Sequence, residues 1–407
     1  MKCRHCKNKI MELVIDLGCQ PPSNSYLTER DLNKKENYFP LKVFICDSCF
    51  LVQTQDTTNK KTFFNSNYAY FSSTSTTWLG HSKRYVSKVV NELKLDNNSF
   101  VLEIASNDGY LLKNFLYKNI PCLGIEPAES TAREAIKLGL NTWVDFYSLP
   151  LAEKIAEEYG KADLVICNNV YAHVPDINDF TKALETNLKD NAVVTLEFPH
   201  LLNLIKQCQF DTIYHEHYSY LSVRTVSEIF KKNGLRIFKV EKIPTHGGSV
   251  RIYGCKKNAQ HKTNQSIGKI IDEEKQEGLF DLNQYHAFRT NAEKIKAEFL
   301  DFLYKAKVKG KKVCAYGAAA KGNTLINFAK VDRDLIPFVA DASNSKVNKF
   351  LPGSRIPILA PSSLFDFNPD YVIILPWNLA TEIKEKFSKL ADQGCKFFTF
   401  VPEIKEI

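Results

Sequence analysis

The stretch between residues 85 and 255 constrains the fold more than any other part of the chain, because short apolar runs alternate there with amphipathic segments. Four of these runs read SFVLEIA, PCLGIEP, ADLVICNNV and AVVTLEFP. Near-continuous apolar runs of this length are typical of strands that are buried on both faces of a parallel sheet. Amphipathic stretches such as residues 128–138 would supply the helices between them. The sequence therefore predicts a doubly wound α/β core.

A second α/β series follows near the end of the chain. It begins at KKVCAYG and continues through PFVADAS, DYVIILPW and KFFTFVP. The residues before it are highly charged and helical in their apolar spacing, whereas the start of the chain carries paired cysteines and many polar turns. We therefore expect an N-terminal lobe, an α/β core, a helical connector and a C-terminal α/β domain. Their expected limits are residues 1–80, 81–258, 259–310 and 311–407.

Composition is ordinary for a globular protein, with 44% hydrophobic and 25% charged residues. The net charge of +8 is spread along 407 residues, without a basic cluster interleaved with aromatic residues, so no nucleic-acid partner is expected. A mild positive balance suits a small substrate that carries phosphate. The sequence does not set the oligomeric state, and a monomer is the default expectation.

Localisation is inferred from the apolar runs and from the cysteines. No run reaches about 18 apolar residues, so no membrane-spanning helix is expected. The N-terminus, MKCRHCKNKI, lacks the apolar core of a signal peptide. The eleven cysteines are odd in number, and several lie singly in apolar strands. These features favour a reducing, cytoplasmic environment over a disulfide framework.

Two C-x-x-C pairs near the N-terminus have the spacing of a zinc site. Cys3 and Cys6 form the first pair, and Cys46 and Cys49 form the second. Four thiolates suit tetrahedral zinc, and a full set of protein ligands leaves no open position for catalysis. Unrelated thiols and a redox pair are the alternatives, but a redox C-x-x-C more often stands alone at a helix start. We expect structural Zn²⁺, which would substitute for a core that so small a lobe can hardly build.

The segment VLEIASNDGYLLKNF ends a predicted strand and opens a helix. The next predicted strand ends in Glu126, at the position where doubly wound folds hold ribose hydroxyls. The G-x-G-x-x-G of a dinucleotide site is missing. The pattern favours a nucleoside cofactor without phosphates, S-adenosylmethionine, with Glu103 near its cationic methionine part. A generic α/β turn, with Asp108 and Gly109 present for backbone reasons, is the alternative.

Later elements keep the order expected of a methyltransferase. An Asp-Phe pair of the kind in VDFYS often lies beside adenine in such enzymes, and Asn168 ends the fourth strand beside the same crevice. The expected cofactor-binding residues are Glu103, Ala105, Asn107, Asp108, Glu126, Pro127, Asp145, Phe146 and Asn168.

The stretch TIYHEHYSYLS concentrates histidine, glutamate and tyrosine in the middle of the chain. If it is extended, His215 and His217 point to one side, and Tyr214, Glu216 and Tyr218 to the other. The H-E-H spacing differs from the H-E-x-x-H of zinc proteases. A polar loop with hydrogen-bonded histidines is the plain alternative.

Three further segments, VYAHVPD, NYAYFSSTS and PTHGGSVRIYG, add groups of the same kind. They supply His173, Tyr68, Tyr70, His246, Ser249 and Arg251. An imidazole accepts a proton near neutral pH, a carboxylate steadies its charged form, and a tyrosine hydroxyl stabilises an oxygen that gains charge. Such a set suits removal of a proton beside a carbonyl. Because the resulting enolate carbon can attack a sulfonium methyl, the cluster favours C-methylation over O-methylation.

Taken with these residues, the sequence resembles the nucleotide-sugar C-methyltransferases of deoxysugar biosynthesis, which act on carbon 3 of 4-keto sugars. The resemblance covers almost the whole chain and depends on seven motifs. They are the two C-x-x-C pairs, Y-A-Y-F-S-S at 68–73, E-I-A-S-N-D-G at 103–109, N-V-x-A-H-V-P at 169–175, I-Y-H-E-H at 213–217, H-G-G-S-x-R at 246–251 and Y-G-A-A-A-K-G-N-T at 316–324. The family combines a zinc-binding lobe, a class I S-adenosylmethionine-binding Rossmann-like core and a C-terminal Rossmann-like domain.

The resemblance also implies roles for individual residues. His217 would be the general base, flanked by Tyr214 and Glu216, and His173 and Tyr70 would complete the pocket. In one departure, the glycines usual in the first loop of methyltransferases are replaced by Ala105 and Ser106.

The segment VCAYGAAAKGNTLINF reads as a strand, a turn of small residues and a helix. Small residues allow close approach of a ligand, and the N–H groups at a helix start attract phosphate. We therefore expect it to bind the nucleotide diphosphate, while simple packing of the helix on the strand is the alternative. The expected substrate-binding residues are Tyr68, His246, Ser249, Arg251, Tyr316, Lys321, Asn323 and Thr324.

Two other functions compete with this interpretation. One is a binding module built on a degenerate methyltransferase fold, against which the acid–base cluster argues. The other is a methyltransferase with another small-molecule acceptor, including O-methylation of a sugar.

Overall fold

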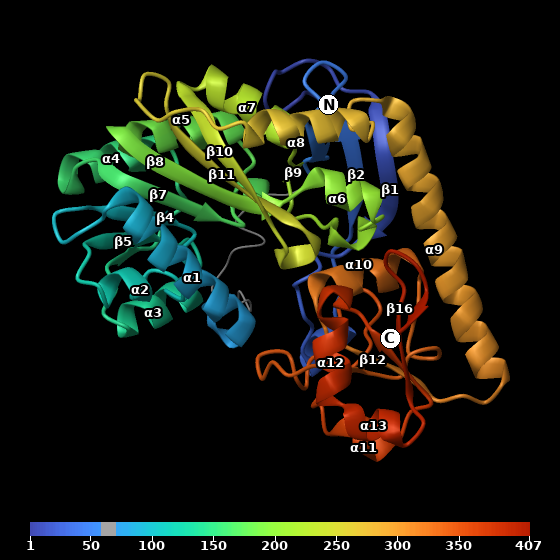
Figure 1. The fold of residues 1–407 in the computed structure, drawn as a ribbon. Coiled ribbons are helices and arrows are strands. Elements are labelled where there is room, and N and C mark those ends of the chain that lie inside the picture. The colour runs from blue at the N-terminus through green and yellow to red at the C-terminus, as the bar shows by residue number, and fades with distance from the viewer. Residues whose placement is uncertain (58–70) are drawn as a thin grey trace.

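The computed structural model describes residues 1–57 and 71–407, so Tyr68 and Tyr70 lie outside the described residues. Within the described part, the strands form three separate sheets. Figure 1 shows the large central sheet beside the N-terminal sheet, with the C-terminal sheet below and the long helix α9 along one side.

The central sheet has seven strands in the order β10-β11-β8-β7-β4-β5-β6. Its strands are β4 (Val101–Ile104), β5 (Cys122–Ile125), β6 (Thr142–Trp143), β7 (Ala162–Asn168), β8 (Leu188–Pro199), β10 (Leu235–Ile243) and β11 (Ser249–Lys256). Strands β6, β5, β4, β7 and β8 are parallel, and β11 is antiparallel to both of its neighbours. The four apolar runs predicted as strands are β4, β5, β7 and β8; β4, β5 and β7 have parallel neighbours on both sides, and β8 is parallel to β7 and antiparallel to β11. The carboxyl ends of these strands therefore lie along one edge.

Helices cover both faces of this sheet (Figure 1). One face packs on α1 (Thr76–Leu93), α2 (Lys113–Leu116) and α3 (Glu129–Lys137). The other packs on α4 (Leu149–Tyr159), α5 (Ile177–Asn187) and α7 (Val223–Lys232). Buried side chains such as Phe115 on α2 and Phe230 on α7 show why both strand faces had to be apolar. The doubly wound arrangement predicted from the sequence is confirmed.

The N-terminal sheet is antiparallel and has the order β1-β2-β3-β9. It contains β1 (Glu12–Gln20), β2 (Phe39–Ile45), β3 (Val52–Thr54) and β9 (Ser219–Tyr220). Strand β9 lies within the stretch TIYHEHYSYLS, residues 212–222, which is called the histidine-rich segment below, and its Tyr220 pairs with Val52. This pairing fixes the histidine-rich segment against the N-terminal lobe.

Three helices join the parts of the chain: α6 (Leu201–Lys206), α8 (Ser266–Gln276) and the long α9 (Leu282–Val308). Along α9, apolar residues such as Phe288 and Phe299 enter a core shared with β1, β2, α6 and the C-terminal domain. Arg289 on α9 donates from Nε to the carbonyl oxygen of Val14 on β1, at 3.1 Å. The helix therefore ties the N-terminal sheet to the C-terminal domain.

The C-terminal sheet has the order β14-β13-β12-β15-β16-β17, and β17 is antiparallel to β16 whereas the other pairs are parallel. Its strands are β12 (Val313–Tyr316), β13 (Val339–Ala340), β14 (Ile358–Leu359), β15 (Tyr371–Ile374), β16 (Lys396–Thr399) and β17 (Lys405–Glu406). The helices are α10 (Ala320–Phe328), α11 (Ser363–Phe367), α12 (Ala380–Lys386) and α13 (Ser388–Asp392). The second strand–helix series is therefore a small α/β domain, as predicted. No helix within residues 1–57 or 71–407 combines the length and the apolar character needed to cross a bilayer.

Candidate active site

A cavity of about 360 Å³ opens at the carboxyl edge of the central sheet. Its wall takes residues from the loops after β4, β5 and β7, from the histidine-rich segment and from the start of α10. The cavity lies where open α/β sheets bind ligands, and its volume is in the range of small-molecule sites. It is therefore the natural place to look for the predicted chemistry.

The loop after β4 has an unusual backbone. Ala105 and Asn107 have φ values of +55° and +51°, a region that L-residues rarely adopt. Such strain, of order 1–3 kcal/mol for each residue, is typical of functional loops. The backbone N–H of Asn107 donates to one carboxylate oxygen of Glu126 and that of Ala128 donates to the other, both at 2.8 Å. The loop thus holds the Glu126 carboxylate in the cavity wall.

The groups around this loop fit a nucleoside cofactor. Glu126, Pro127 and Phe146 line the cavity, and burial raises the pKa of Glu126. Oδ1 of Asn168 is buried in the same wall and has no hydrogen-bond partner among the described residues. A buried polar atom without a partner costs about 1–3 kcal/mol, which a polar ligand would recover. A carboxylate for ribose hydroxyls, an unpaired amide oxygen and apolar surfaces together suit S-adenosylmethionine.

Three of the expected cofactor-binding residues do not line the cavity. Glu103 is buried on β4, and burial raises its pKa well above the usual value, with further contributions from Glu126 and Asp108. Asp108 accepts a hydrogen bond from the backbone N–H of Ser73 at 3.0 Å. Asp145 is exposed. The structure therefore brings Ala105, Asn107, Glu126, Pro127, Phe146 and Asn168 together around the cavity.

The histidine-rich segment turns instead of running straight. The backbone N–H of His217 donates to the carbonyl oxygen of Tyr214 at 2.9 Å, which closes a turn through His215 and Glu216. The predicted alternation of side chains is therefore wrong. Tyr214, Glu216 and His217 all line the cavity, whereas Nε2 of His215 donates to the carbonyl oxygen of Phe39, at 3.2 Å.

His217 is held in a defined orientation. Its Nδ1 donates to the carbonyl oxygen of Thr212 at 3.0 Å, which leaves the lone pair of the neutral ring on Nε2. Its ring centroid lies 3.9 Å from that of Tyr214 and 4.7 Å from that of His173. A proton acceptor thus stands beside a phenol and a second imidazole.

Glu216 and His173 have strongly shifted pKa values because both are buried. Burial raises the pKa of Glu216 to about 7, against the opposing effect of hydrogen bonds from the side-chain amide of Asn24. Burial lowers the pKa of His173 to about 4. Nδ1 of His173 donates to the backbone carbonyl oxygen of Glu216 at 2.9 Å. Near neutral pH, His173 is therefore uncharged and Glu216 is close to its point of half-ionisation.

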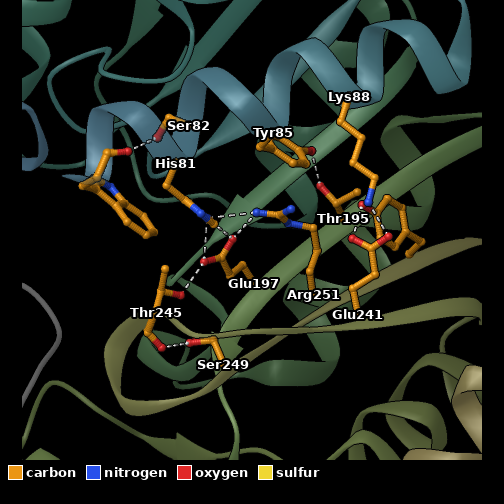
Figure 2. Close-up of polar contacts among 12 residues, drawn as sticks. His81, Ser82, Tyr85, Lys88, Thr195, Glu197, Glu241, Thr245, Ser249 and Arg251 are labelled. Carbon is orange, nitrogen blue, oxygen red and sulfur yellow. Dashed lines mark hydrogen bonds and ion pairs between the residues drawn. The ribbon is translucent and has the colours of Figure 1, made fainter. Parts of the chain in front are cut away.

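Ser249 and Arg251 do not line the cavity. They belong to a polar network that Figure 2 shows between α1, β8 and β11. Nη2 of Arg251 forms an ion pair with the buried carboxylate of Glu197 at 2.5 Å, and Nε2 of His81 lies 3.0 Å from the same carboxylate. Ser249 donates from Oγ to the carbonyl oxygen of Thr245, at 3.0 Å. The network joins α1 to β8 and β11. The side chain of His246 lies outside the described structure.

The C-terminal domain contributes two lysines to the cavity, Lys321 and Lys346. Nζ of Lys321 donates to Oδ1 of Asn378 at 2.8 Å and lies 4.5 Å from the ring centroid of Trp377. Nζ of Lys346 donates to the carbonyl oxygen of Ala318 at 2.9 Å. Burial lowers the pKa of both lysines, so an anion in the cavity would stabilise their charged forms.

The other residues of this domain that were expected to bind substrate, Tyr316, Asn323 and Thr324, do not line the cavity. Tyr316 packs in an apolar cluster against Phe387, at a centroid distance of 5.0 Å. Oγ1 of Thr324 donates to the carbonyl oxygen of Ile213 at 2.9 Å, so it supports the histidine-rich segment. Asn323 is buried, and neither polar atom of its side-chain amide has a partner among the described residues.

Packing explains the two glycines of this segment. A Cβ on Gly322 would lie 2.7 Å from Cβ of Leu375. Gly317 has a φ of +94°, and a Cβ there would lie 2.3 Å from Cδ of Pro376. The packing alternative raised from the sequence thus accounts for the glycines, while Lys321 reaches the cavity.

Asn24, Trp78 and Lys346 are among the cavity residues that were not expected from the sequence. Asn24 follows β1, Trp78 opens α1 and Lys346 follows β13. Each is a single residue in a loop or at a helix start, without a motif around it.

The four paired cysteines come together in the N-terminal lobe. Sγ of Cys3 lies 3.5 Å from Sγ of Cys49, and Sγ of Cys6 lies 3.5 Å from Sγ of Cys46. All four sulfur atoms lie within 4.8 Å of one another. Zn–S bonds of about 2.3 Å in a tetrahedron place sulfur atoms at comparable separations. The quartet therefore fits a structural zinc ion with four protein ligands.

The strand order of the central sheet defines the class of the protein. The sheet has six strands that run in one direction and one antiparallel strand next to its edge, which is the arrangement of class I S-adenosylmethionine-dependent methyltransferases, and its cleft lies at the carboxyl ends of the first strands. Here β11 is the antiparallel strand, and the loops after β4 and β5 form the cleft.

Comparisons with known proteins identify the family. Three family models match, described as a putative zinc binding domain (residues 3–64), a methyltransferase domain (residues 78–240) and a C-methyltransferase C-terminal domain (residues 244–402). The chain is 30% identical over 406 residues to the C-methyltransferase NovU of Streptomyces niveus, covering 100% of this chain and 96% of that protein. The chain belongs to the C-methyltransferase family that its motifs resemble, and it is an S-adenosylmethionine-dependent C-methyltransferase with a structural zinc site.

Solved structures share lower similarity. Magnesium protoporphyrin IX methyltransferase (ChlM) from Synechocystis PCC 6803, with bound SAH, is 17% identical, covers 44% of this chain and 83% of its own, and has a TM-score of 0.35. The PH0226 protein of Pyrococcus horikoshii OT3 is 16% identical, covers 46% of this chain and 95% of its own, and has a TM-score of 0.39.

Proposed function

We propose that the enzyme methylates carbon 3 of a nucleoside-diphosphate 4-keto sugar, after a base removes the proton beside the ketone. The observation that carries the proposal is the setting of His217. Its Nδ1–H donates to the carbonyl oxygen of Thr212, so Nε2 is the atom that can accept a proton. The ring lines the same cavity as the loop after β4. A base in this position answers a need of C-methylation, since a sugar carbon is no nucleophile until it is deprotonated.

The proposed proton transfer uses three side chains. Nε2 of His217 takes the proton from carbon 3, and the electrons of the C–H bond form the enolate. The carboxylate of Glu216, adjacent in the chain, stabilises the imidazolium that results. The hydroxyl of Tyr214 donates a hydrogen bond to the oxygen that gains negative charge. Bound S-adenosylmethionine supplies an electrophilic methyl group to the nucleophilic carbon.

His173 has a different part in this proposal. Because burial lowers its pKa to about 4, its ring stays neutral and does not compete for the proton. Its hydrogen bond to the backbone of Glu216 holds the turn in place. Tyr70 and Tyr68 remain candidates for the pocket on the basis of the sequence resemblance.

The nucleotide diphosphate would occupy the side of the cavity formed by the C-terminal domain, residues 311–407. Lys321 and Lys346 supply positive charge there, and the first turn of α10 supplies backbone N–H groups without intrahelical partners. The loops after β4, β5 and β7 contribute no lysine or arginine to the described cavity wall. This division of charge favours a diphosphate near α10 and an uncharged nucleoside near β5.

A substrate screen tests the proposal. The purified enzyme is incubated with S-adenosylmethionine that carries a labelled methyl group and with a panel of nucleoside-diphosphate 4-keto sugars. The products are analysed by mass spectrometry and carbon NMR. We expect a label with the chemical shift of a methyl group on carbon, at the position beside the ketone. A methyl signal on oxygen, or turnover of free keto sugars as fast as nucleotide-linked ones, would contradict it.

A further inference from the structure

Arg4 lies between the first two cysteines of the metal site, but its side chain contacts the segments that carry His173 and His217. It is buried, with 6% of its surface exposed. Its Nε donates to the carbonyl oxygen of Tyr218 at 3.2 Å, and its Nη1 to that of Pro175 at 3.0 Å. Its Nη2 donates to the carbonyl oxygen of Thr54 at 3.2 Å and forms an ion pair with Asp56. One guanidinium therefore joins three separate chain segments.

Two of these segments carry the proposed acid–base residues. Tyr218 follows His217 directly, and Pro175, which lines the cavity, lies two residues after His173. The third segment also reaches His217, because Oγ1 of Thr54 donates to its carbonyl oxygen at 2.9 Å. The three residues whose carbonyl oxygens accept from Arg4 are therefore all near the two histidines. Tyr218 and Pro175 lie within two residues of His217 and His173 in the chain, and Thr54 contacts His217 directly.

Attachment of the cysteine lobe to the core does not depend on Arg4 alone. Nδ1 of His5 lies 2.9 Å from Oδ1 of Asn178 on α5, and Nδ2 of Asn178 donates to the carbonyl oxygen of His5 at 2.9 Å. Nζ of Lys232 donates to the same carbonyl oxygen at 3.0 Å. The lobe is therefore anchored by His5, and the contacts of Arg4 are additional and directed at the active site.

We propose that Arg4 is a positioning residue for methyl transfer, which fixes the segment of His173 relative to the segment of His217. The cysteine quartet fixes Arg4 in turn, because Cys3 and Cys6 flank it in the chain. The metal site then serves the chemistry as well as the stability of the lobe. A planar guanidinium suits this task because Nε, Nη1 and Nη2 each donate to a different segment, whereas the three donors of a lysine all lie on one nitrogen. The proposal rests on the proposed role of His217 as the base.

Two variants of Arg4 and one control test the proposal in the full-length protein. Arg4→Met removes the hydrogen bonds of the guanidinium, Arg4→Lys keeps the charge, and Lys2→Met removes a charge from an exposed residue of the same lobe. Zinc content, binding of S-adenosylhomocysteine by calorimetry, kcat and KM are measured for each. We expect zinc content, cofactor binding and KM to stay as in the wild type in Arg4→Met, while kcat falls about 100-fold, the size of effect expected from a misplaced reacting group. Arg4→Lys should be intermediate and Lys2→Met unchanged.

A measurement without substrate separates this proposal from the proposed function. In protein labelled at the histidine rings, NMR signals of His173 and His217, assigned with His173→Gln and His217→Asn, should shift in Arg4→Met and stay in place in Lys2→Met. Normal kcat or unshifted signals in Arg4→Met would overturn the positioning role. Loss of zinc or of the fold in both Arg4 variants would overturn it too, because Arg4 would then serve folding alone. Shifted signals combined with full activity of His217→Asn would instead refute the base assignment.

Discussion

The side-chain amide of Asn24 donates hydrogen bonds to both carboxylate oxygens of Glu216, at 2.9 and 3.1 Å. The two residues are 192 positions apart, and Asn24 belongs to the loop after β1. Two residues further on, the hydroxyl of Tyr26 donates to the carbonyl oxygen of Ala318 at 2.6 Å, in the C-terminal domain. One loop of the N-terminal lobe therefore contacts both the turn that carries Glu216 and His217 and the segment that leads into α10.

Replacing Asn24 by alanine should move the pH dependence of the enzyme. The amide of Asn24 favours the ionised form of Glu216, whose pKa burial already raises to about 7. Without the amide, the pKa should rise further, so ionised Glu216 would appear only at higher pH. We expect the acidic limb of kcat/KM against pH to move to higher pH. The exposed Asn97→Ala is the matched control. A profile that coincides with that of the wild type would show that Glu216 does not set this limb.

Glu216→Gln should change how stability depends on pH. The ordinary carboxyl pKa is 4.5, and the folded value is about 7 because of burial. The folded protein therefore keeps a proton that the unfolded chain releases, so the contribution of Glu216 is fully present below pH 4.5 and is lost as pH rises to about 7. The loss amounts to about 3 kcal/mol. Relative to the wild type, Glu216→Gln should gain stability across this window.

Denaturation by urea at about pH 5 and about pH 8 measures this effect. Comparison of each variant with the wild type cancels the other titrating groups. Glu157→Gln, at an exposed position on α4, is the control and should show the same stability difference at both pH values. If the difference between Glu216→Gln and the wild type is also constant, the carboxyl of Glu216 does not titrate in this range.

His217→Asn should stop removal of the sugar proton without affecting the cofactor. With S-adenosylhomocysteine bound in heavy water, the wild type should exchange the hydrogen on carbon 3 for deuterium. Loss of a general base typically costs 10²–10⁴-fold, and we expect the exchange rate to fall by about this factor. Calorimetry should give unchanged binding of S-adenosylhomocysteine. His215→Asn is the matched control, since His215 contacts Phe39 outside the cavity wall. Equal exchange in His217→Asn and the wild type would mean that another group is the base.

Cys46→Ser should release the metal and weaken the N-terminal lobe. Serine offers no thiolate, so the tetrahedral set would be incomplete. We expect the zinc content to fall well below one ion per chain and the protein to lose more than about 3 kcal/mol of stability, because metal binding contributes directly to folding. Elemental analysis and thermal denaturation measure both. Cys19→Ser, at an exposed cysteine outside the quartet, should change neither. Full zinc retention in Cys46→Ser would refute the quartet as the metal site.

Local sequence signals predicted the fold well where they exist. Buried parallel strands leave near-continuous apolar runs, which is why β4, β5, β7 and β8 were recognised. Strand β9 has only two residues, and its partner β3 lies more than 160 positions earlier in the chain. No local periodicity in the sequence therefore predicts this strand. The link between the N-terminal lobe and the histidine-rich segment therefore required the structure.

The candidate site was predictable in its motifs and not in its geometry. The extended alternation assigned to the histidine-rich segment was wrong, because a turn brings Glu216 and His217 to the same cavity and sends His215 elsewhere. Asn24 and Lys346 are single loop residues, and the direction of a loop side chain depends on tertiary contacts that leave no mark in the sequence. Arg4 lies inside a C-x-x-C motif, and because the two cysteines account for that motif, nothing in the sequence suggested a role for the arginine.

Removing the positive charges of the C-terminal domain should weaken binding of the nucleotide part of the substrate. Lys321 and Lys346 line the cavity on the side of α10, and both are partly buried. A hydrogen bond between a charged donor and an anion contributes about 1.5–3 kcal/mol, so Lys346→Met and Lys321→Met should each raise the Kd of a nucleoside diphosphate by about 10- to 100-fold. Calorimetry with the nucleoside diphosphate alone measures this without turnover.

The same measurement distinguishes a specific diphosphate site from general attraction by charge. Lys349→Met removes a charge three residues from Lys346 but outside the cavity wall, and it should leave the Kd unchanged. Exposed charges more than about 8 Å apart are largely screened at physiological salt, so a long-range effect of net charge would fade with added salt in all three variants alike. Weakening in Lys346→Met that persists at high salt and is absent in Lys349→Met would locate the diphosphate beside α10. If Lys321→Met and Lys346→Met both bind the nucleoside diphosphate as the wild type does, the diphosphate lies elsewhere, because neither of these lysines could then contact it.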